Sequence, residues 1–214
     1  LLKDGKIERI EDQDIFSDPK TIVDECDVFD LKGKLLMPGL IDAHAHLVVI
    51  QKLKNGYPDE MSTLVENLKA TEALKMVYAT KNAESTLLGG FTTVKDVGQG
   101  DNITLRETIS RRLVLGPRIV ACGWIGITGG HQKELVSEGS FELTSKNDDR
   151  GVDGPWKVRR KVREWVNRGV DCIKVFATGG GYQEFPGSNK WGDRVNLSLE
   201  ELEAIVTEAH AAGR

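Results

Sequence analysis

The sequence predicts an α/β fold in which four strand–helix units form the first half of a (β/α)8 TIM-type barrel, after a short β unit. Runs of β-branched and apolar residues recur four times, and each is followed by a segment with helical spacing of apolar residues. Repeated strand–helix units imply a parallel sheet covered by helices. Half of a barrel and a small open sheet both satisfy this pattern. Polar residues near the carboxyl ends of the first and fourth strands, where barrel enzymes hold their sites, decide for the barrel.

The β unit is expected over residues 1–34, a segment too short to bury a core of its own. The stretch Lys3-Asp4-Gly5-Lys6 contains the Asp-Gly pair that is favoured in tight hairpins. A second turn is expected at Lys32-Gly33-Lys34, directly before the first strand of the barrel segment. We therefore divide the chain into a small β domain at 1–34 and a barrel segment at 35–214.

The barrel segment alternates strands and helices. Strands are expected at 35–47, 91–97, 118–123 and 172–178, and helices at 62–88, 101–114, 155–169 and 198–213. Helix starts are marked by Asp101 as a cap, by Pro155 in a first turn, and by a capping box of Ser198 and Glu201. The apolar stripes of the last two helices predict their buried faces: Val158, Val162, Trp165 and Val166, and Leu199, Leu202, Ile205, Val206 and Ala209. Basic residues around the first stripe, Lys161 among them, are interpreted as a solvated face.

Composition excludes several classes of function. The 214 residues are 39% hydrophobic and 29% charged, which is typical of a globular protein. A formal net charge of −4 gives no reason to expect nucleic acid or an anionic membrane as a partner. No apolar stretch approaches the ~18 residues of a membrane span. The three cysteines, Cys26, Cys122 and Cys172, are odd in number and far apart, which argues against a disulfide framework or a thiolate zinc site and favours the cytoplasm.

Two histidines stand one residue apart in the apolar run LLMPGLIDAHAHLVVI at 35–50. Successive side chains of a strand point to opposite faces, so Asp42, His44 and His46 are expected to share one face. The residues between them are small or apolar and suit packing. We therefore expect one face of this strand to carry functional side chains and the other face to pack in the core.

Lys174 is the second unusual residue, because it stands in the apolar strand CIKVFATGG. Burial of a charged, unpaired lysine costs several kcal/mol of folding free energy. The lysine otherwise gives up its proton, because burial can lower its pKa by as much as ~3–5 units. The neutral amine is a nucleophile that can add carbon dioxide to give a carbamate, an anionic ligand with two oxygens. The alternative is a lysine that reaches the barrel mouth or pairs with an acid such as Asp96.

The motifs together resemble the amidohydrolase superfamily. MPGLIDAHAHL resembles its first-strand signature with the metal-binding His-x-His, and GGFTTVKDVG, GPRIVACG, TGGH, GVDCIKVFATGGG and EAHAAGR follow in the order of its prolidase- and imidazolonepropionase-like branch. That branch includes Xaa-Pro dipeptidases and ochratoxin-hydrolysing amidases. The resemblance covers essentially all of the chain, and it implies that the β unit at 1–34 is part of a small β-sandwich.

The resemblance also implies a binuclear metal-dependent hydrolase that cleaves an amide or peptide bond, of an Xaa-Pro dipeptide or an N-acyl amino acid, with a metal-bridged hydroxide. His44 and His46 would bind the more buried ion, and carbamylated Lys174 would bridge two divalent ions, zinc first, with manganese or cobalt as substitutes. The implied partners are a small-molecule substrate and the remainder of the barrel, and a homo-oligomer is left open.

Two departures from the branch concern the substrate and the remaining ligands. The chain reads Thr-Gly-Gly-His131-Gln-Lys where the branch has Thr-Gly-Gly-His-Gly-Asp, so His131 is either a substrate-orienting residue or a structural one. Tyr182 is either a substrate contact or part of a packed loop. The family's other two histidine ligands and its catalytic aspartate are expected beyond Arg214, in a polypeptide of roughly 400 residues. We interpret His210, in the middle of a helix, as structural.

Two alternatives are kept open. One is a mononuclear deaminase or cyclic-amidine hydrolase of the same superfamily, in which Lys174 is unmodified. The other is a non-catalytic barrel relative, against which the presence of His44, His46 and Lys174 argues, or a fragment without the catalytic acid. Expressed alone, the 214 residues are expected to be inactive.

Overall fold

A computed structural model describes residues 2–10, 27–98, 100–127, 152–178 and 195–214. The chain divides into two compact units, Leu1–Pro38 and Gly39–Arg214, and each is described by itself. None of the helices within the described ranges is both long and apolar enough to cross a membrane.

The first unit contains a hairpin of β1 (Leu2–Lys3) and β2 (Lys6–Ile7), which pair in antiparallel fashion. Its turn residues Asp4 and Gly5 both have positive φ, 49° and 73°, as the Asp-Gly pair predicted. The second predicted turn is present too, because the Lys34 N–H donates to the carbonyl of Leu31. The assignment of 1–34 to a β-sandwich stays a prediction.

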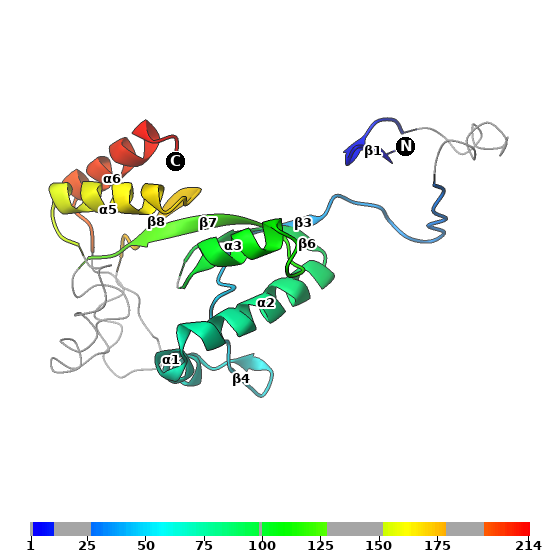
Figure 1. The fold of residues 1–214 in the computed structure, drawn as a ribbon, viewed down its shortest axis with the longest axis horizontal. Coiled ribbons are helices and arrows are strands. Elements are labelled where there is room, and N and C mark those ends of the chain that lie inside the picture. Colours follow the sequence, from blue (N-terminus) through cyan, green and yellow to red (C-terminus); the bar gives the residue numbers. More distant parts are fainter. Residues whose placement is uncertain (1, 11–26, 99, 128–151, 179–194) are drawn as a thin grey trace. The chain divides into compact units, whose positions relative to one another are not determined.

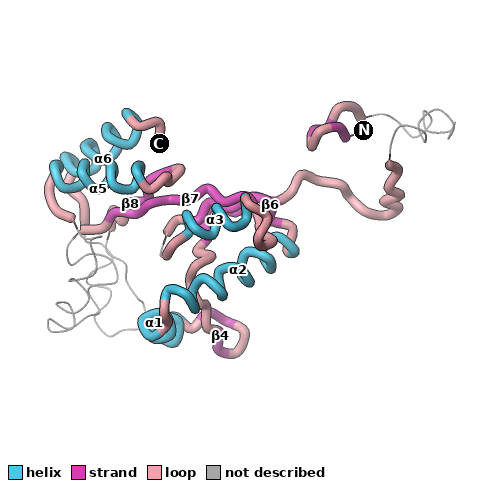
Figure 2. The backbone as a smooth tube through the Cα atoms, in the orientation of Figure 1, coloured by secondary structure: helices cyan, strands magenta, loops and turns pink. Residues whose placement is uncertain are grey.

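The second unit is organised around a four-stranded parallel sheet. Its strands are β3 (Leu40–Ala45), β6 (Phe91–Asp96), β7 (Arg118–Ile125) and β8 (Cys172–Val175), in the order β3-β6-β7-β8 (Figure 2). All three pairings are parallel. The predicted half-barrel architecture is therefore confirmed. A short hairpin of β4 (Leu53–Lys54) and β5 (Tyr57–Pro58) lies between β3 and the first helix in the chain.

The helices are α1 (Glu60–Lys69), α2 (Glu72–Leu88), α3 (Asn102–Ser110), α5 (Pro155–Asn167) and α6 (Leu199–Ala211). Asp101 caps α3, Pro155 lies in the first turn of α5, and Ser198 and Glu201 form the predicted capping box of α6. The prediction of a single helix at 62–88 is wrong, because two helices, α1 and α2, occupy this segment. Ala70 ends α1 in an extended conformation, and the Thr71 side chain accepts a hydrogen bond from the Leu74 N–H to start α2.

Two clusters of buried apolar residues join the sheet to its helices. One lies under α2 and α3, where Ala79, Ala83 and Leu105 pack against Val94 and Ile119. The other lies under α5 and α6, which run side by side at the β7–β8 edge (Figure 1). Its members include Ile125, Val158, Val162, Trp165, Ala204, Ile205 and Ala209.

The buried faces of α5 and α6 differ in part from the predicted stripes. Leu199 and Val206 are 71% and 49% exposed, so they are not part of the buried face of α6. Glu201 is buried instead, because its carboxylate accepts hydrogen bonds from the backbone N–H groups of Gly154 and Ser198. Lys161 is also buried rather than solvated, since it flanks the Val158–Val162 stripe and pairs with Glu164.

The cysteines correct a second expectation. β7 and β8 pair so that Cys122 lies opposite Cys172, and the two form a disulfide across 50 residues of sequence. Distance along the chain was a poor guide, because parallel pairing brings residues from consecutive strand–helix units side by side. The cytoplasmic location stays a prediction and loses the support of unpaired cysteines.

Gly123 of β7 lies close to Trp165 of α5, and we predict that Gly123→Ala destabilises the fold. A Cβ atom at Gly123 would overlap Cγ of Trp165, whose ring is held by a hydrogen bond from Nε1 to the carbonyl of Trp124. We expect a loss of about 1–3 kcal/mol in the free energy of unfolding, measured by urea denaturation. Gly126→Ala is the control, because its Cβ would meet only ordinary contacts at 3.7 Å and beyond. Equal stability of the two variants would contradict this account.

Candidate metal centre

His44 and His46 lie together at the carboxyl end of β3. Their ring centroids are 5.3 Å apart and the rings meet edge to face. Nδ1 of His46 lies 3.0 Å from the carbonyl oxygen of Gly98, which follows β6. A carbonyl oxygen only accepts hydrogen bonds, so Nδ1 carries the hydrogen, and in the neutral ring Nε2 then has the free lone pair. This is the state in which an imidazole binds a metal through Nε2.

β3 is irregular around these residues, which corrects the predicted common face. Its register on β6 shifts between Leu40 and Ile41 and again between Asp42 and Ala45. Asp42 pairs with Val94, whose side chain is buried on the helix-covered side of the sheet. Because the register shifts after Asp42, side chains do not simply alternate between Asp42 and His44, and the two are not assigned to one face. Asp42 instead accepts a hydrogen bond from the His44 N–H through Oδ1, at 2.9 Å. Its carboxylate thus fixes the backbone at the histidine.

Lys174 lies on β8 opposite Trp124, and it is half-buried. Its Nζ lies 4.7 Å from the centroid of the Phe176 ring. Burial lowers the pKa of Lys174 from 10.5, and the positive charge of Lys95 lowers it further. In the described part of the chain no ion pair joins Lys174 to a carboxylate, and Asp96 in particular bonds elsewhere. The arrangement therefore makes the neutral amine more accessible than it is for a lysine in water.

The histidine pair and Lys174 influence one another electrostatically. The pKa of His44 is lowered from 6.5, first by burial, then by the positive charge of Lys174 and by His46. A lowered pKa keeps the imidazole neutral at pH 7, as metal binding requires. Two imidazoles and a lysine of lowered pKa are a donor set that fits a divalent metal ion, once the lysine carries a carbamate.

His131 and Tyr182 lie outside the described residues. Among the residues that are described, no three His, Cys, Asp or Glu side chains gather to hold a metal ion. His210 lies exposed in the last turn of α6, and no catalytic role is predicted for it.

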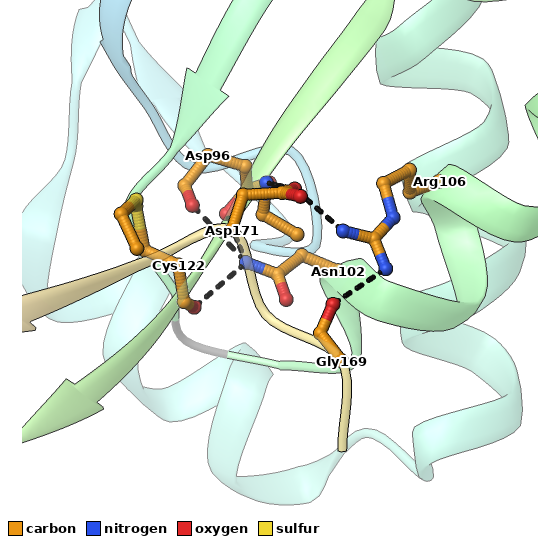
Figure 3. Close-up of polar contacts among 8 residues, drawn as sticks. Asp96, Asn102, Arg106, Cys122, Gly169 and Asp171 are labelled. Atoms are coloured by element: carbon orange, nitrogen blue, oxygen red, sulfur yellow. Dashed lines mark hydrogen bonds and ion pairs between the residues drawn. A yellow bond between two sulfur atoms is a disulfide. The ribbon is translucent and has the colours of Figure 1, made fainter. Parts of the chain in front are cut away.

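A buried polar network beside the histidines was missed by the sequence analysis (Figure 3). Asp96, fully buried at the end of β6, accepts hydrogen bonds from the N–H groups of Leu47 and Gly98 and from Nδ2 of Asn102. Burial raises the pKa of Asp96, and its N–H donors act against that rise. The available signal was a lone aspartate in the β-branched run FTTVKDVG, which was considered only as a partner of Lys174.

A second polar contact ties the start of β8 to α3 and β7. Arg106 pairs with Asp171 and donates a hydrogen bond to the carbonyl of Gly169 (Figure 3). The same Asp171 carboxylate accepts from the Ala121 N–H at 2.8 Å. This contact fixes the residue that precedes β8 against the middle of β7, where Ala121 pairs with Asp96 of β6.

Comparison with known proteins agrees with this geometry. A family model described as "Amidohydrolase family" matches residues 35–214. The ochratoxinase of Aspergillus niger is 28% identical over 193 residues, which cover 84% of this chain and 38% of that protein. A solved structure of a prolidase complexed with N-methylphosphonate-L-proline is 31% identical, with a TM-score of 0.63, and the match covers 83% of this chain and 41% of that one. A solved structure of a Xaa-Pro dipeptidase with bound methionine is 32% identical, with a TM-score of 0.66, and the match covers 82% of this chain and 41% of that one.

The chain thus spans about two fifths of the length of these relatives. The family match covers far more than half of the chain and includes all four parallel strands with His44, His46 and Lys174. The chain belongs to the amidohydrolase family.

Proposed function

We propose that the full-length protein is a metal-dependent hydrolase that cleaves the amide or peptide bond of a small substrate, of the Xaa-Pro dipeptide or N-acyl amino acid type. The family match and the likeness to a prolidase, a Xaa-Pro dipeptidase and an ochratoxinase support hydrolysis of such bonds. The observation that carries the proposal is the placement of two neighbouring imidazoles and a lysine of lowered pKa at the carboxyl ends of β3 and β8.

In this proposal His44 and His46 hold one divalent ion through ring nitrogens, and Lys174, as a carbamate, bridges to a second. Zinc suits these nitrogen and oxygen ligands, and manganese or cobalt can replace it. When bound, such ions lower the pKa of water towards ~7 and polarise the scissile carbonyl. Gly98 orients His46 through its carbonyl, and the half-buried position of Lys174 favours the neutral amine that adds carbon dioxide.

The carbamate forms with a balanced transfer of atoms. The neutral Nζ of Lys174 attacks the carbon of carbon dioxide, a new N–C bond forms, and one proton leaves the nitrogen for solvent. The product carries one negative charge and two oxygens. Because a charged lysine cannot make this attack, a lowered pKa promotes the modification near neutral pH.

A substrate panel tests the proposed function. The full-length protein, loaded with zinc, manganese or cobalt, is assayed with Xaa-Pro dipeptides, N-acyl amino acids and a cyclic amidine, and release of the amine is measured. We expect turnover of amide or peptide substrates that a chelator abolishes and added metal restores. Turnover of the cyclic amidine alone, with one metal ion per chain, would support the mononuclear alternative instead. Absence of turnover on all three classes would contradict the proposal.

A further inference from the structure

We propose that Asp96 is a positioning residue for His46: it fixes the two backbone segments that hold the imidazole, and so selects the tautomer with a free Nε2. The inference rests on the proposed function for its consequence, metal binding, but not for its geometry. The tautomer is a property of the protein without metal and can be measured there.

Asp96 connects the two segments that flank the His46 ring. Its Oδ2 accepts a hydrogen bond from the N–H of Leu47, the residue directly after His46, at 3.0 Å. Its Oδ1 accepts from the N–H of Gly98, also at 3.0 Å, and the carbonyl of Gly98 is the partner of His46 Nδ1. One carboxylate therefore holds the backbone on the histidine side and the backbone on the acceptor side.

Gly98 is held in a conformation that few other residues adopt. Its φ is +102°, and a Cβ at this position would lie 2.7 Å from Cδ1 of Trp124. Without a fixed anchor, a glycine in this region has wide conformational freedom. The hydrogen bond from its N–H to Asp96 restricts that freedom and keeps the carbonyl pointed at His46.

Asn102 locks the carboxylate in turn. The Asn102 side chain is 2% exposed, and its Nδ2 lies within 3.2 Å of Asp96 Oδ1, of the Asp96 carbonyl and of the Cys122 carbonyl. Figure 3 shows the amide between Asp96 and Cys122. The chain of contacts thus runs from β7 and the first turn of α3, through Asp96, to Gly98 and His46. A buried carboxylate persists when N–H donors surround it, and here the donors come from the elements that must be aligned.

The alternative is that Asp96 only stabilises the end of β6. Both roles predict a loss of stability on substitution, so stability alone does not separate them. The positioning role predicts two further changes: a mixture of tautomers at His46, and weaker metal binding, of the order of 10- to 100-fold, which is typical when the outer partner of a histidine ligand is lost.

Asp96→Asn in the full-length protein tests the inference. The asparagine amide has the same shape as the carboxylate. Its NH2 group, however, would face one of the two backbone N–H groups that donate to Asp96 in the wild-type protein. In wild-type protein without metal, labelled with 15N-histidine, we expect the His46 signals of an Nδ1–H tautomer. In Asp96→Asn we expect averaged tautomer signals, and zinc affinity lowered about 10- to 100-fold in competition with a chelator.

Asp171→Asn is the matched control. Asp171 likewise accepts from a strand N–H, that of Ala121, but its hydrogen-bond partners are Ala121 and Arg106 and not the two segments that flank His46. We expect this variant to lose stability while it keeps the His46 tautomer and the zinc affinity. If Asp96→Asn does not fold, Asn102→Ser, which removes the donor at 3.2 Å from Asp96, is measured in the same way.

Wild-type tautomer and wild-type zinc affinity in a folded variant would overturn the inference and leave Asp96 a structural residue. The proposed function fails by a different result. If the wild-type protein neither binds metal nor hydrolyses amides, the tautomer of His46 in the variant still decides whether Asp96 positions it.

Discussion

The double substitution His44→Ala and His46→Ala is expected to remove bound metal and hydrolytic activity together. The two rings lie 5.3 Å apart, and Nε2 of His46 is left free by the contact of Nδ1 with Gly98, so the pair supplies the nitrogen ligands of the proposed centre. Loss of several kcal/mol of metal-dependent stabilisation of the transition state corresponds to a fall in kcat/KM of at least about 1,000-fold. Elemental analysis of the purified protein and the amide assay measure both effects.

His210→Ala is the control for this experiment. His210 is exposed on α6, so its removal tests whether the loss of any histidine lowers metal content through surface binding. We expect wild-type metal content and activity in His210→Ala. Unchanged metal content in the double variant would rule out His44 and His46 as ligands.

Lys174→Ala is expected to abolish activity, with partial recovery when short carboxylic acids are added. The variant leaves a space on β8 where a small carboxylate can take the place of the proposed carbamate. We expect a fall in kcat/KM of at least about 1,000-fold, with recovery of a measurable fraction in millimolar acetate or propionate. Lys174→Arg should be equally inactive and should not recover, because the guanidinium fills the space and keeps a positive charge.

A direct measurement accompanies the substitutions. In 13C-bicarbonate the wild-type protein should show a carbamate carbon resonance that is absent from Lys174→Ala. Since burial lowers the pKa of Lys174 below 10.5, protonation of this lysine destabilises the folded state relative to the unfolded state. Its contribution to stability is present above pH 10.5 and is lost as pH falls through the lowered pKa, and the carbamate resonance should weaken in the same direction. A fully metal-loaded, active protein with no carbamate resonance would refute the bridging role.

Strand–helix alternation made the architecture of this chain predictable, because hydrophobic spacing and caps are local signals. Asp101, Pro155 and Ser198 each begin a helix where the sequence indicated. The break between α1 and α2 was not predicted, because the apolar spacing runs on through Ala70 and Thr71. Whether the chain continues as one helix there depends on which neighbour the apolar residues pack against, and that is tertiary information.

The candidate site was predictable where its residues break the local pattern. Histidines and a lysine in apolar strands are costly without a function, so His44, His46 and Lys174 stood out. Asp96 did not, because a single aspartate near the end of a strand is also common before a turn. Its three donors come from Leu47, Gly98 and Asn102, which only the folded chain brings together. The face of Asp42 was mispredicted for a similar reason, since a register shift leaves no mark in the sequence.

The bond between Cys122 and Cys172 has a consequence for a chain that has been cut. All peptide bonds between positions 122 and 172 lie inside the loop that this bond closes, 50 residues apart in sequence. A protease that cleaves once in that interval therefore yields two fragments that migrate as a single species on a gel without reductant and separate when a thiol is added. Gly98, the partner of His46, and the strand that carries Lys174 then remain in one molecule after a backbone nick.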